Sequence, residues 1–321
     1  MSSEVIATDL EAFFDFSIIT PVYNDERFIE QTLNSVISVC RNFSYEHIVI
    51  NDGSTDGTSS ILTKYKKSIN LIDIENGGQA NAINKGLAIA RGKYSLIVNS
   101  DDPLLDSKLF TQAKQVLDNE KSIVCVYPDW QIIDECNRLV QEIKVKDYSF
   151  EELYCHFNCL VGPGGIFRTE VARKLEGWNS KYKYVPDYDF WLRMTNYGNF
   201  KHVDGNLASW RKHPNSISVK SKTYSMALER IEVINSKVAK LTNSNHSLDK
   251  VALANAYLNA AILGYFDPEI PAKKWLIKSI SHSHRVLNRK NLAKIFFILG
   301  LPLSRKILNF LELKGLRRKL D

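Results

Sequence analysis

The segment Phe16-Ser-Ile-Ile-Thr-Pro-Val-Tyr-Asn24 is a short β-rich run that Pro21 stops, and a helical pattern follows it directly. From Glu26 to Cys40 the apolar residues recur three or four positions apart, which predicts a helix with one buried face. A strand that leads at once into a helix is the beginning of a crossover connection, the kind that joins parallel strands. The segment therefore predicts a parallel sheet whose first loop contains Pro21 to Asn24.

The same alternation of strand and helix patterns repeats through the first 130 residues. Further strands are predicted over 46–50, 69–74, 94–99 and 123–127, and helices over 58–67, 79–90 and 107–119. The pattern is less regular over 129–165, and from about residue 218 it is helical to the end. This order predicts an α/β domain with a helical C-terminal extension.

The formal net charge of +6 is concentrated at one end of the chain. Residues 285–321 contain ten Lys or Arg and two acids, a net charge of +8, so the remaining residues sum to −2. No nucleic-acid-binding module is recognisable, and nucleic acid is not an expected partner. The tail interleaves basic and apolar residues, which fits an anionic membrane surface or a helical cap equally well.

Neither a membrane-spanning segment nor a disulfide framework is expected. The longest late apolar run, Ile295 to Leu303, has nine residues, whereas a spanning helix needs about 20. The N-terminus does not read as a signal peptide, and the five cysteines have no small-scaffold spacing. We therefore expect a cytoplasmic protein, either free or peripheral on the inner face of the plasma membrane.

Polar loops follow each of the first four predicted strands. They span 20–24, 51–56, 75–79 and 99–102. In an open parallel sheet, ligands bind at the carboxyl ends of the strands, so these loops would line one edge. Their coincidence predicts a binding site at that edge.

Asp101 and Asp102 form the centre of the predicted site. Adjacent carboxylates repel each other unless a cation or hydrogen-bond donors neutralise them, and Mg²⁺ or Mn²⁺ joins such carboxylates to phosphate oxygens. The alternative is that Asp102-Pro103 makes a turn and caps the next helix. The neighbouring polar loops favour the cation.

Five segments in order resemble the signatures of family 2 glycosyltransferases, and the resemblance covers roughly residues 16–215. The segments are Ile19-Thr-Pro-Val-Tyr-Asn24, Asn51-Asp-Gly-Ser-Thr-Asp-Gly-Thr58, Asn76-Gly-Gly-Gln79 with Asn84-Lys-Gly86, Asn99-Ser-Asp-Asp102 and Pro186-Asp-Tyr-Asp-Phe-Trp-Leu-Arg193. The resemblance implies a GT-A fold, a nucleotide-diphospho-sugar donor, a divalent metal and inversion at the anomeric carbon. It further implies a GT-A domain over 1–217, with a nucleotide-binding half at about 16–128 and an acceptor half at about 129–217, followed by the extension over 218–321.

Carried over position by position, the resemblance assigns nine residues to the donor. They are Thr20, Pro21, Tyr23, Asn24, Asp52, Asn76, Gly78, Gln79 and Asp101. Asp102 is implied as the direct metal ligand, with Asp101 on the ribose or a metal-bound water, and His213 resembles a late histidine that reaches the metal or the diphosphate. The resemblance implies a UDP-sugar as the donor, with a GDP- or dTDP-sugar as the next alternative.

Asp187 matches the family's catalytic base, although Pro186 stands where the family usually has an acid. Asp189 is the alternative base, and the simplest structural reading is that Asp187 only caps a helix. Candidate substrate contacts are Asp129, Gly164, Gly165 and Trp178.

The expected reaction moves one sugar to a hydroxyl of a glycan or lipid-linked acceptor. The Gln-x-x-Arg-Trp signature of processive members is absent from the sequence. The alternatives are a catalytically inactive binding protein of the same family, and a dinucleotide-dependent oxidoreductase. The latter is disfavoured because no Gly-x-Gly-x-x-Gly follows the first strand. Sugar, linkage and oligomeric state do not follow from the sequence.

Overall fold

The computed structural model of the protein describes residues 13–214, 224–240, 246–265 and 270–299. The chain forms two compact units. The sheet unit comprises Met1–Ser149, Cys159–Lys181 and Pro186–Ser216, and the helical unit comprises Phe150–Asn158, Tyr182–Val185 and Ile217–Asp321.

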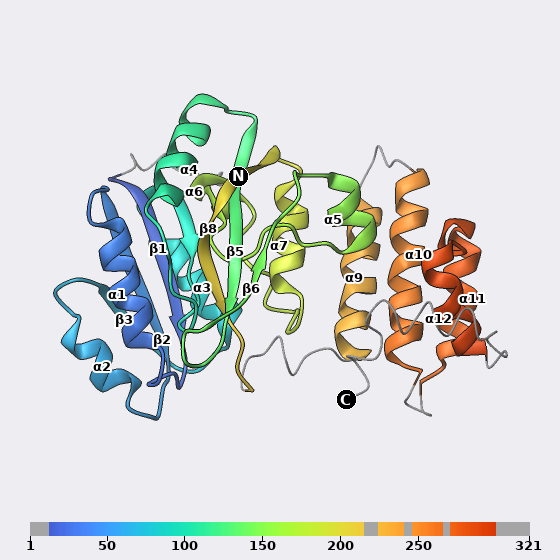
Figure 1. Cartoon of the computed structure of the whole chain (residues 1–321), viewed down its shortest axis with the longest axis horizontal. Helices are drawn as coiled ribbons and strands as arrows, with labels where there is room; N and C mark the ends of the chain where they lie inside the picture. Colours follow the sequence, from blue (N-terminus) through green and yellow to red (C-terminus); the bar gives the residue numbers. More distant parts are fainter. Residues whose placement is uncertain (1–12, 215–223, 241–245, 266–269, 300–321) are drawn as a thin grey trace, which may run out of the picture. The chain divides into compact units, whose positions relative to one another are not determined.

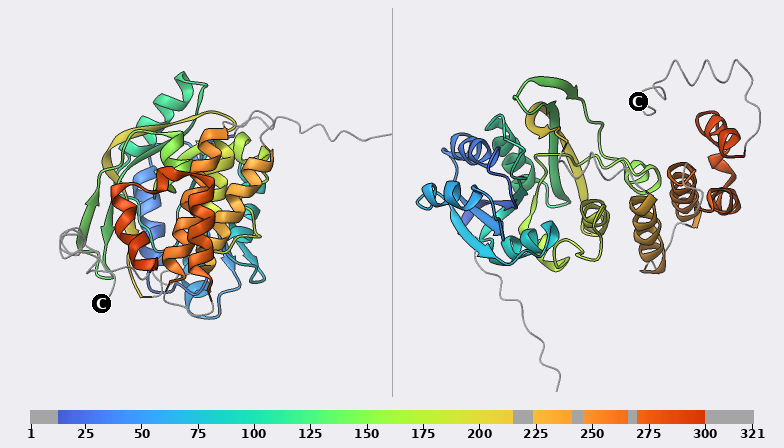
Figure 2. Two further views of the ribbon diagram at one scale, coloured as in Figure 1. Left: turned by 90° about the vertical axis from the view of Figure 1, so that its right-hand side faces the viewer. Right: turned by 90° about the horizontal axis from the view of Figure 1, so that it is seen from below.

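The sheet unit contains one mixed sheet with helices on both faces (Figures 1 and 2). Its strands are β1 (Phe14–Val22), β2 (Tyr45–Asp52), β3 (Asn70–Ile74), β4 (Gly92–Ile97), β5 (Ile123–Ile133), β6 (Leu139–Ile143), β7 (Ile166–Arg168) and β8 (Asn199–Arg211). Its helices are α1 (Ile29–Cys40), α2 (Thr58–Lys64), α3 (Gln79–Ile89), α4 (Lys108–Asn119), α6 (Thr169–Lys174) and α7 (Pro186–Met194).

The two faces of β1 pack against different helices, which is why nearly the whole strand is buried. Phe16 and Ile18 lie in one apolar core with residues of α1 and α4. Ile19 faces α3, where a Cβ added to Gly86 would lie 2.5 Å from its Cγ2, so only glycine allows this approach. Strands covered on both faces are typical of the parallel part of α/β sheets.

The strand order places six carboxyl ends at one edge of the sheet. The order is β3-β2-β1-β4-β7-β5-β6, and β8 pairs with β5 outside this path. The strands β1 to β4 are mutually parallel, β7 is antiparallel to both β4 and β5, and β8 is parallel to β5. Therefore β5 and β8 end at the same edge as β1 to β4. We call it the carboxyl edge.

The helical unit consists of short and long helices around a small apolar core. They are α5 (Phe150–His156), α9 (Tyr224–Lys240), α10 (His246–Leu263), α11 (Ala272–His282), the 3₁₀ helix η1 (His284–Val286) and α12 (Arg289–Leu299). The core joins α10, α11 and α12 through Ala254, Leu258, Leu276 and Ile298. None of the helices in the described ranges has the length and hydropathy required to span a bilayer.

The predicted α/β class with a helical C-terminal region is confirmed. The main difference concerns β5, which was expected to end at Tyr127 but continues to Ile133 through Pro128. The segment predicted as irregular therefore contains the second half of β5, β6 and α5. The helical unit also takes in Phe150–Asn158 and Tyr182–Val185 in addition to the predicted extension.

Candidate active site

The loops after β1 and β2 are bonded to each other through Asn24. Its backbone N–H donates to Ser54 Oγ at 3.0 Å, and its Oδ1 accepts from the Thr55 N–H at 2.7 Å. Asn24 has a φ of 48°, the left-handed region that asparagine tolerates better than most residues. These bonds fix the relative position of two predicted donor-binding loops.

Asp52 holds the loop after β3. Its Oδ1 and Oδ2 accept from the backbone N–H groups of Gly77 and Gly78 at 2.8 and 2.9 Å, and its side chain is buried. Asn76 donates from Nδ2 to the Asp52 carbonyl oxygen. The predicted contact between the Asp52 carboxylate and the base would have to share these lone pairs. In contrast, a Cβ placed on Gly78 would meet no atom within 4 Å, so the backbone there borders open space.

A chain of hydrogen bonds connects the start of α3 with the end of β8. Gln79 Nε2 donates to Asn99 Oδ1 at 3.0 Å, and Asn99 Nδ2 donates to Asp102 Oδ2 at 2.9 Å. The other oxygen, Asp102 Oδ1, accepts from the Arg211 backbone N–H at 2.7 Å. Burial, and next the charge of Asp101, raise the pKa of Asp102. Both of its oxygens are therefore engaged by the protein.

Arg211 is a central residue of the edge that the sequence reading did not select. Its side chain is completely buried and lies over the Phe28 ring, 4.6 Å from the ring centroid. The guanidinium donates to the carbonyl oxygens of Asp101 and Asp134 and to the side-chain oxygens of Asn137 and Gln31. It thus joins the Asp101–Asp102 turn to α1 and to the β5–β6 connection. The local sequence, Arg211-Lys-His-Pro-Asn215, contains no pattern that indicates this role.

Asp101 and His213 form a partly exposed pair of potential metal ligands at this edge. Asp101 Oδ2 lies 2.9 Å from His213 Nε2, and the two side chains are 21% and 13% exposed. His213 follows β8 by two residues, so the parallel course of β8 brings it to the turn after β4. Both side chains provide atoms that bind Mn²⁺ or Mg²⁺ or position a bound water.

A third acid at this edge, Asp25, was also missed. Its Oδ2 is buried and lacks a hydrogen-bond partner among the described residues. Burial raises the pKa of Asp25 to about 6, and the charge of Asp101 acts in the same direction. A hydrogen bond with Ser100 and the charges of His213 and Arg211 lower this pKa in part. A buried carboxylate oxygen without a donor is a group that a cation would satisfy. Asp25, Asp101 and His213 therefore fit a divalent cation better than Asp102, whose predicted role as direct ligand conflicts with its two hydrogen bonds.

Asp129 belongs to a separate polar group. Because β5 continues to Ile133, Asp129 lies inside this strand and not in a loop after it. It is 1% exposed and accepts hydrogen bonds from the Lys144 side chain, His202 and the backbone of Val145 and Gly205. Burial raises the pKa of Asp129, but these hydrogen bonds lower it more, so the pKa lies below its usual range. The saturated carboxylate has no free position for a sugar hydroxyl, contrary to the predicted contact.

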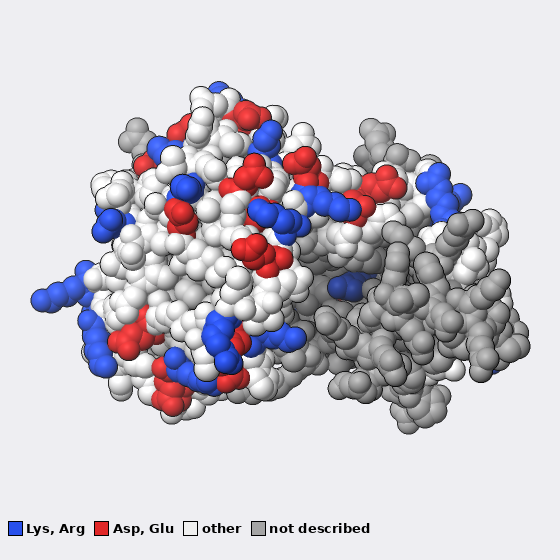
Figure 3. All heavy atoms as spheres, in the orientation of Figure 1, with Lys and Arg blue, Asp and Glu red and all other residues white. Residues whose placement is uncertain are grey.

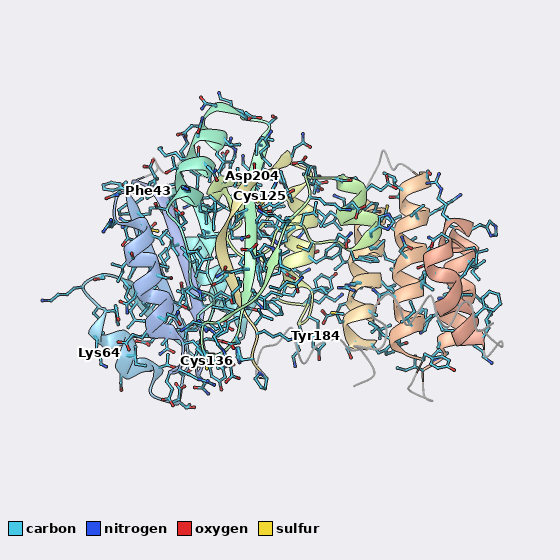
Figure 4. The ribbon with its side chains drawn as sticks, in the orientation of Figure 1. Phe43, Lys64, Cys125, Cys136, Tyr184 and Asp204 are labelled. Carbon is cyan, nitrogen blue, oxygen red and sulfur yellow. The ribbon has the colours of Figure 1, made fainter. Side chains whose placement is uncertain are left out.

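With His202 and Asp204, Asp129 places potential ligand atoms within 4.8 Å of one another. However, Lys144 already provides the positive charge beside Asp129, at 2.8 Å. Figure 4 labels Asp204 and Cys136 near opposite ends of the sheet unit, and Cys136 lies in the β5–β6 connection that Arg211 binds. This group is therefore distinct from the Asp101–His213 pair.

The first turn of α7 contains the two candidate bases. Asp189 is buried and its Oδ2 accepts from Arg193 Nε at 2.7 Å, while the Arg193 guanidinium also donates to the Leu175 and Gly177 carbonyl oxygens. Asp187 is half-buried, and its Oδ1 accepts from the Tyr188 N–H at 2.8 Å. Since Asp189 serves as the partner of Arg193, the geometry favours Asp187 for contact with a substrate.

The remaining predicted contacts divide into accessible and buried residues. Tyr23 is 51% exposed, whereas Pro21 is buried and Thr20 is fully buried with its hydroxyl 2.9 Å from His47 Nε2. The Thr20 side chain is thus turned to His47, and the assignment of this residue to the donor stays a prediction. Trp178 is 8% exposed, so its ring faces are not open for stacking on a sugar.

Gly164 and Gly165 have a packing role in the structure. A Cβ on Gly164, which has a φ of 85°, would lie 2.9 Å from atoms of Pro128 and Ala208. A Cβ on Gly165 would lie 2.4 Å from Val161 Cγ1. Whether these glycines also border the donor sugar stays a prediction.

The mixed sheet with helices on both faces and a helical C-terminal region is a GT-A fold, as the comparisons below show. The sequence model of the family described as Glycosyl transferase family 2 matches residues 17–175. The chain belongs to the family 2 glycosyltransferases.

Two relatives illustrate the range of the similarity. An uncharacterised glycosyltransferase of Methanocaldococcus jannaschii is 27% identical over 204 residues, which cover 61% of this chain and 70% of that protein. The chondroitin synthase of Pasteurella multocida is 25% identical over 73% of this chain but only 24% of its own length. The chain thus resembles part of a much longer synthase.

Solved structures support the fold. Residues 1–349 of TarS of S. aureus, in complex with UDP-GlcNAc, superpose with a TM-score of 0.64 at 20% identity, covering 82% of this chain and 79% of that TarS chain. The mannosyltransferase PcManGT of Pyrobaculum calidifontis, in complex with GDP-Man and Mn²⁺, superposes with a TM-score of 0.55 at 14% identity. The match covers 89% of this chain and 85% of PcManGT. At these identities the likeness concerns the fold alone.

Proposed function

We propose that this chain moves one sugar from a nucleotide-diphospho-sugar to a hydroxyl group of a glycan or lipid-linked acceptor, with inversion at the anomeric carbon. A UDP-sugar is the expected donor, and surface polysaccharide biosynthesis the expected pathway class. The observation that carries the proposal is the Asp101–His213 pair at the carboxyl edge, beside the unpartnered oxygen of Asp25. The relative named chondroitin synthase and the UDP-GlcNAc complex of TarS agree with the donor and the pathway class.

The donor's diphosphate would lie at the carboxyl edge. Asp101 and His213 would hold Mn²⁺ or Mg²⁺ there, and the negative charge of Asp25 would strengthen the binding. When bound, the cation neutralises the charge that develops on the departing nucleoside diphosphate. The open backbone at Gly78 and the exposed ring of Tyr23 are available to the nucleoside.

Asp187 would remove the proton from the acceptor hydroxyl as this oxygen attacks the anomeric carbon. At the first turn of α7, the partial positive charge of the helix N-terminus favours the ionised carboxylate. Because Arg193 binds Asp189 and two backbone carbonyls, it would fix the adjoining loop and hold the helix start in place. Inversion follows from a single displacement with the base on the face opposite the leaving group.

The direct test is a screen of UDP-, GDP- and dTDP-sugars for thermal stabilisation of the protein and for release of nucleoside diphosphate, with and without Mn²⁺ or Mg²⁺. We expect one UDP-sugar to stabilise the protein only with the metal, and to be hydrolysed slowly without an acceptor. Stabilisation without turnover under all conditions, including mixed glycan acceptors, would favour the inactive binding protein. Proton NMR of the product would report the anomeric configuration.

A further inference from the structure

The last described segment of the helical unit has an extreme charge composition. Residues 270–299 contain seven Lys or Arg and no Asp or Glu. The acids of the described helical unit lie elsewhere, on α5, α9 and α10 (Glu151, Glu152, Glu229, Glu232 and Asp249). No acid within the segment can therefore neutralise its cations.

α11 orders part of this charge into one stripe. Its exposed residues recur at the spacing of a single helix face: Lys273, Lys274, Ile277, Lys278 and Ser281. The opposite face is buried, with Leu276 in the core and Ser279 donating from Oγ to the Ala254 carbonyl oxygen of α10 at 2.7 Å. The packing of α11 onto α10, also seen in Figure 2, therefore determines which face remains open within this unit.

The stripe combines positive charge with exposed apolar surface. Ile277, in its middle, is 67% exposed, and Leu287 and Leu292 further along the segment are 40% and 36% exposed. Lys278 Nζ also lies 5.1 Å from the ring centroid of Trp275. Tryptophan is enriched at the interface between membrane and water. Exposed apolar side chains between lysines are costly in water but insert favourably at a lipid headgroup boundary.

We propose that the exposed stripe of α11, formed by Lys273, Lys274, Ile277 and Lys278, binds the surface of an anionic membrane. The lysines attract acidic headgroups, and Ile277 enters the boundary between headgroups and acyl chains. Such a peripheral contact needs no spanning helix, in keeping with the lengths of the described helices. The stripe lies N-terminal to the basic tail beginning at Arg285, most of which is outside the described residues.

The test is sedimentation of the full-length protein with vesicles of phosphatidylcholine alone or of phosphatidylcholine with phosphatidylglycerol. We compare wild type with the double variant Lys273→Glu/Lys274→Glu and with Ile277→Ser. The control, Lys66→Glu/Lys67→Glu, makes the same charge change at exposed positions of the sheet unit. All of these positions lie outside the candidate active site, so melting temperature and donor hydrolysis in solution should equal those of wild type.

Wild type and the control should bind the anionic vesicles, less at high salt, and should not bind phosphatidylcholine alone. The double reversal should lower the partition coefficient about tenfold or more, since each lysine near an anionic surface contributes about fivefold and the variant loses two of them. Ile277→Ser should lower it several-fold without changing the salt dependence. Equal binding of the double variant and wild type would overturn the proposal, as would stronger binding to duplex DNA than to anionic vesicles.

Discussion

Asp101 Oδ2 lies 2.9 Å from His213 Nε2, although 112 positions separate the two residues in the sequence. The contact exists because β8 runs parallel to β5 and therefore ends at the same edge as β4. A carboxylate and an imidazole that share an open edge can bind a cation together. The pair, and not the adjacent Asp101–Asp102 dipeptide, is the feature on which the proposed donor site depends.

We therefore predict that His213→Ala weakens Mn²⁺-dependent binding of the nucleotide by about 10- to 100-fold, the loss typical of a removed metal ligand or its partner. The measurement is the stabilisation of the protein by UDP and Mn²⁺ together, supported by Mn²⁺ electron paramagnetic resonance. His202→Gln is the matched control, because His202 belongs to the Asp129 group. If His202→Gln weakened Mn²⁺ binding and His213→Ala did not, the metal site would be the Asp129 group.

Asp25→Asn should lower the affinity for Mn²⁺ without lowering the stability of the metal-free protein. It removes the charge of a carboxylate whose burial raises its pKa and whose Oδ2 has no hydrogen-bond partner among the described residues, so the metal-free variant should melt no lower than wild type. The same change should lower Mn²⁺ affinity about tenfold, because one negative charge beside Asp101 is lost. Asp118→Asn, which removes a surface acid paired with Lys93 and Lys114, is the control for net charge. Unchanged Mn²⁺ affinity in Asp25→Asn would contradict the assigned role.

The two acids of α7 should respond differently to removal of their charge. Asp187→Asn should reduce kcat by about 10²- to 10⁴-fold with little change in donor binding, as expected for a lost general base. Asp189→Asn leaves the Arg193 guanidinium without its carboxylate and should cost about 1–3 kcal/mol of stability. Steady-state kinetics and chemical denaturation of both variants make the distinction. A larger loss of kcat in Asp189→Asn at temperatures where it remains folded would reverse the assignment.

Arg211→Met should destabilise the protein by about 3 kcal/mol or more, since it removes donors from a buried network and leaves carbonyl oxygens without partners. Arg211→Lys should recover little of this loss, because one ammonium group cannot reproduce the planar fork that reaches Asp101, Asp134 and Gln31. Denaturant midpoints measure both effects. Wild-type stability in the lysine variant would show that charge alone, without the fork, suffices at this position.

The sequence predicted the parts of the site that depend on local pattern. Asp101, Asn24, Asp52 and Gln79 follow strands whose β-rich runs are short and clearly ended, so their position at one edge follows from topology. Arg211 and Asp25 could not be found this way. Their importance comes from partners on several separate elements, and no local pattern reports such convergence.

The error at Asp129 has a different origin. The predicted strand ended at Tyr127, and proline, which lacks the N–H that a strand ladder uses, stands at the next position. In the structure β5 continues past Pro128, and the register of its pairing with β8 shifts between Pro128 and Asp129. The strand partner that permits this course is more than 60 residues away in the sequence, since Asp129 pairs with Asn206. A pairing of such long range leaves no trace in the residues around Pro128.

His47 provides a prediction on pH. Burial lowers its pKa from the ordinary value of 6.5 to about 3, so the folded protein holds this imidazole neutral beside Thr20. Between those two values the unfolded chain binds a proton that the folded chain does not, and stability therefore falls as the pH falls below 6.5. From pH 6.5 to 4.5 this residue alone should remove about 2–3 kcal/mol. Glutamine cannot titrate, so in His47→Gln the unfolding free energy should fall less steeply between pH 6.5 and 4.5. At pH 7 this variant should be less stable than wild type. Denaturant unfolding at a series of pH values gives both slopes, and identical slopes in the two proteins would mean that His47 is protonated in the folded state.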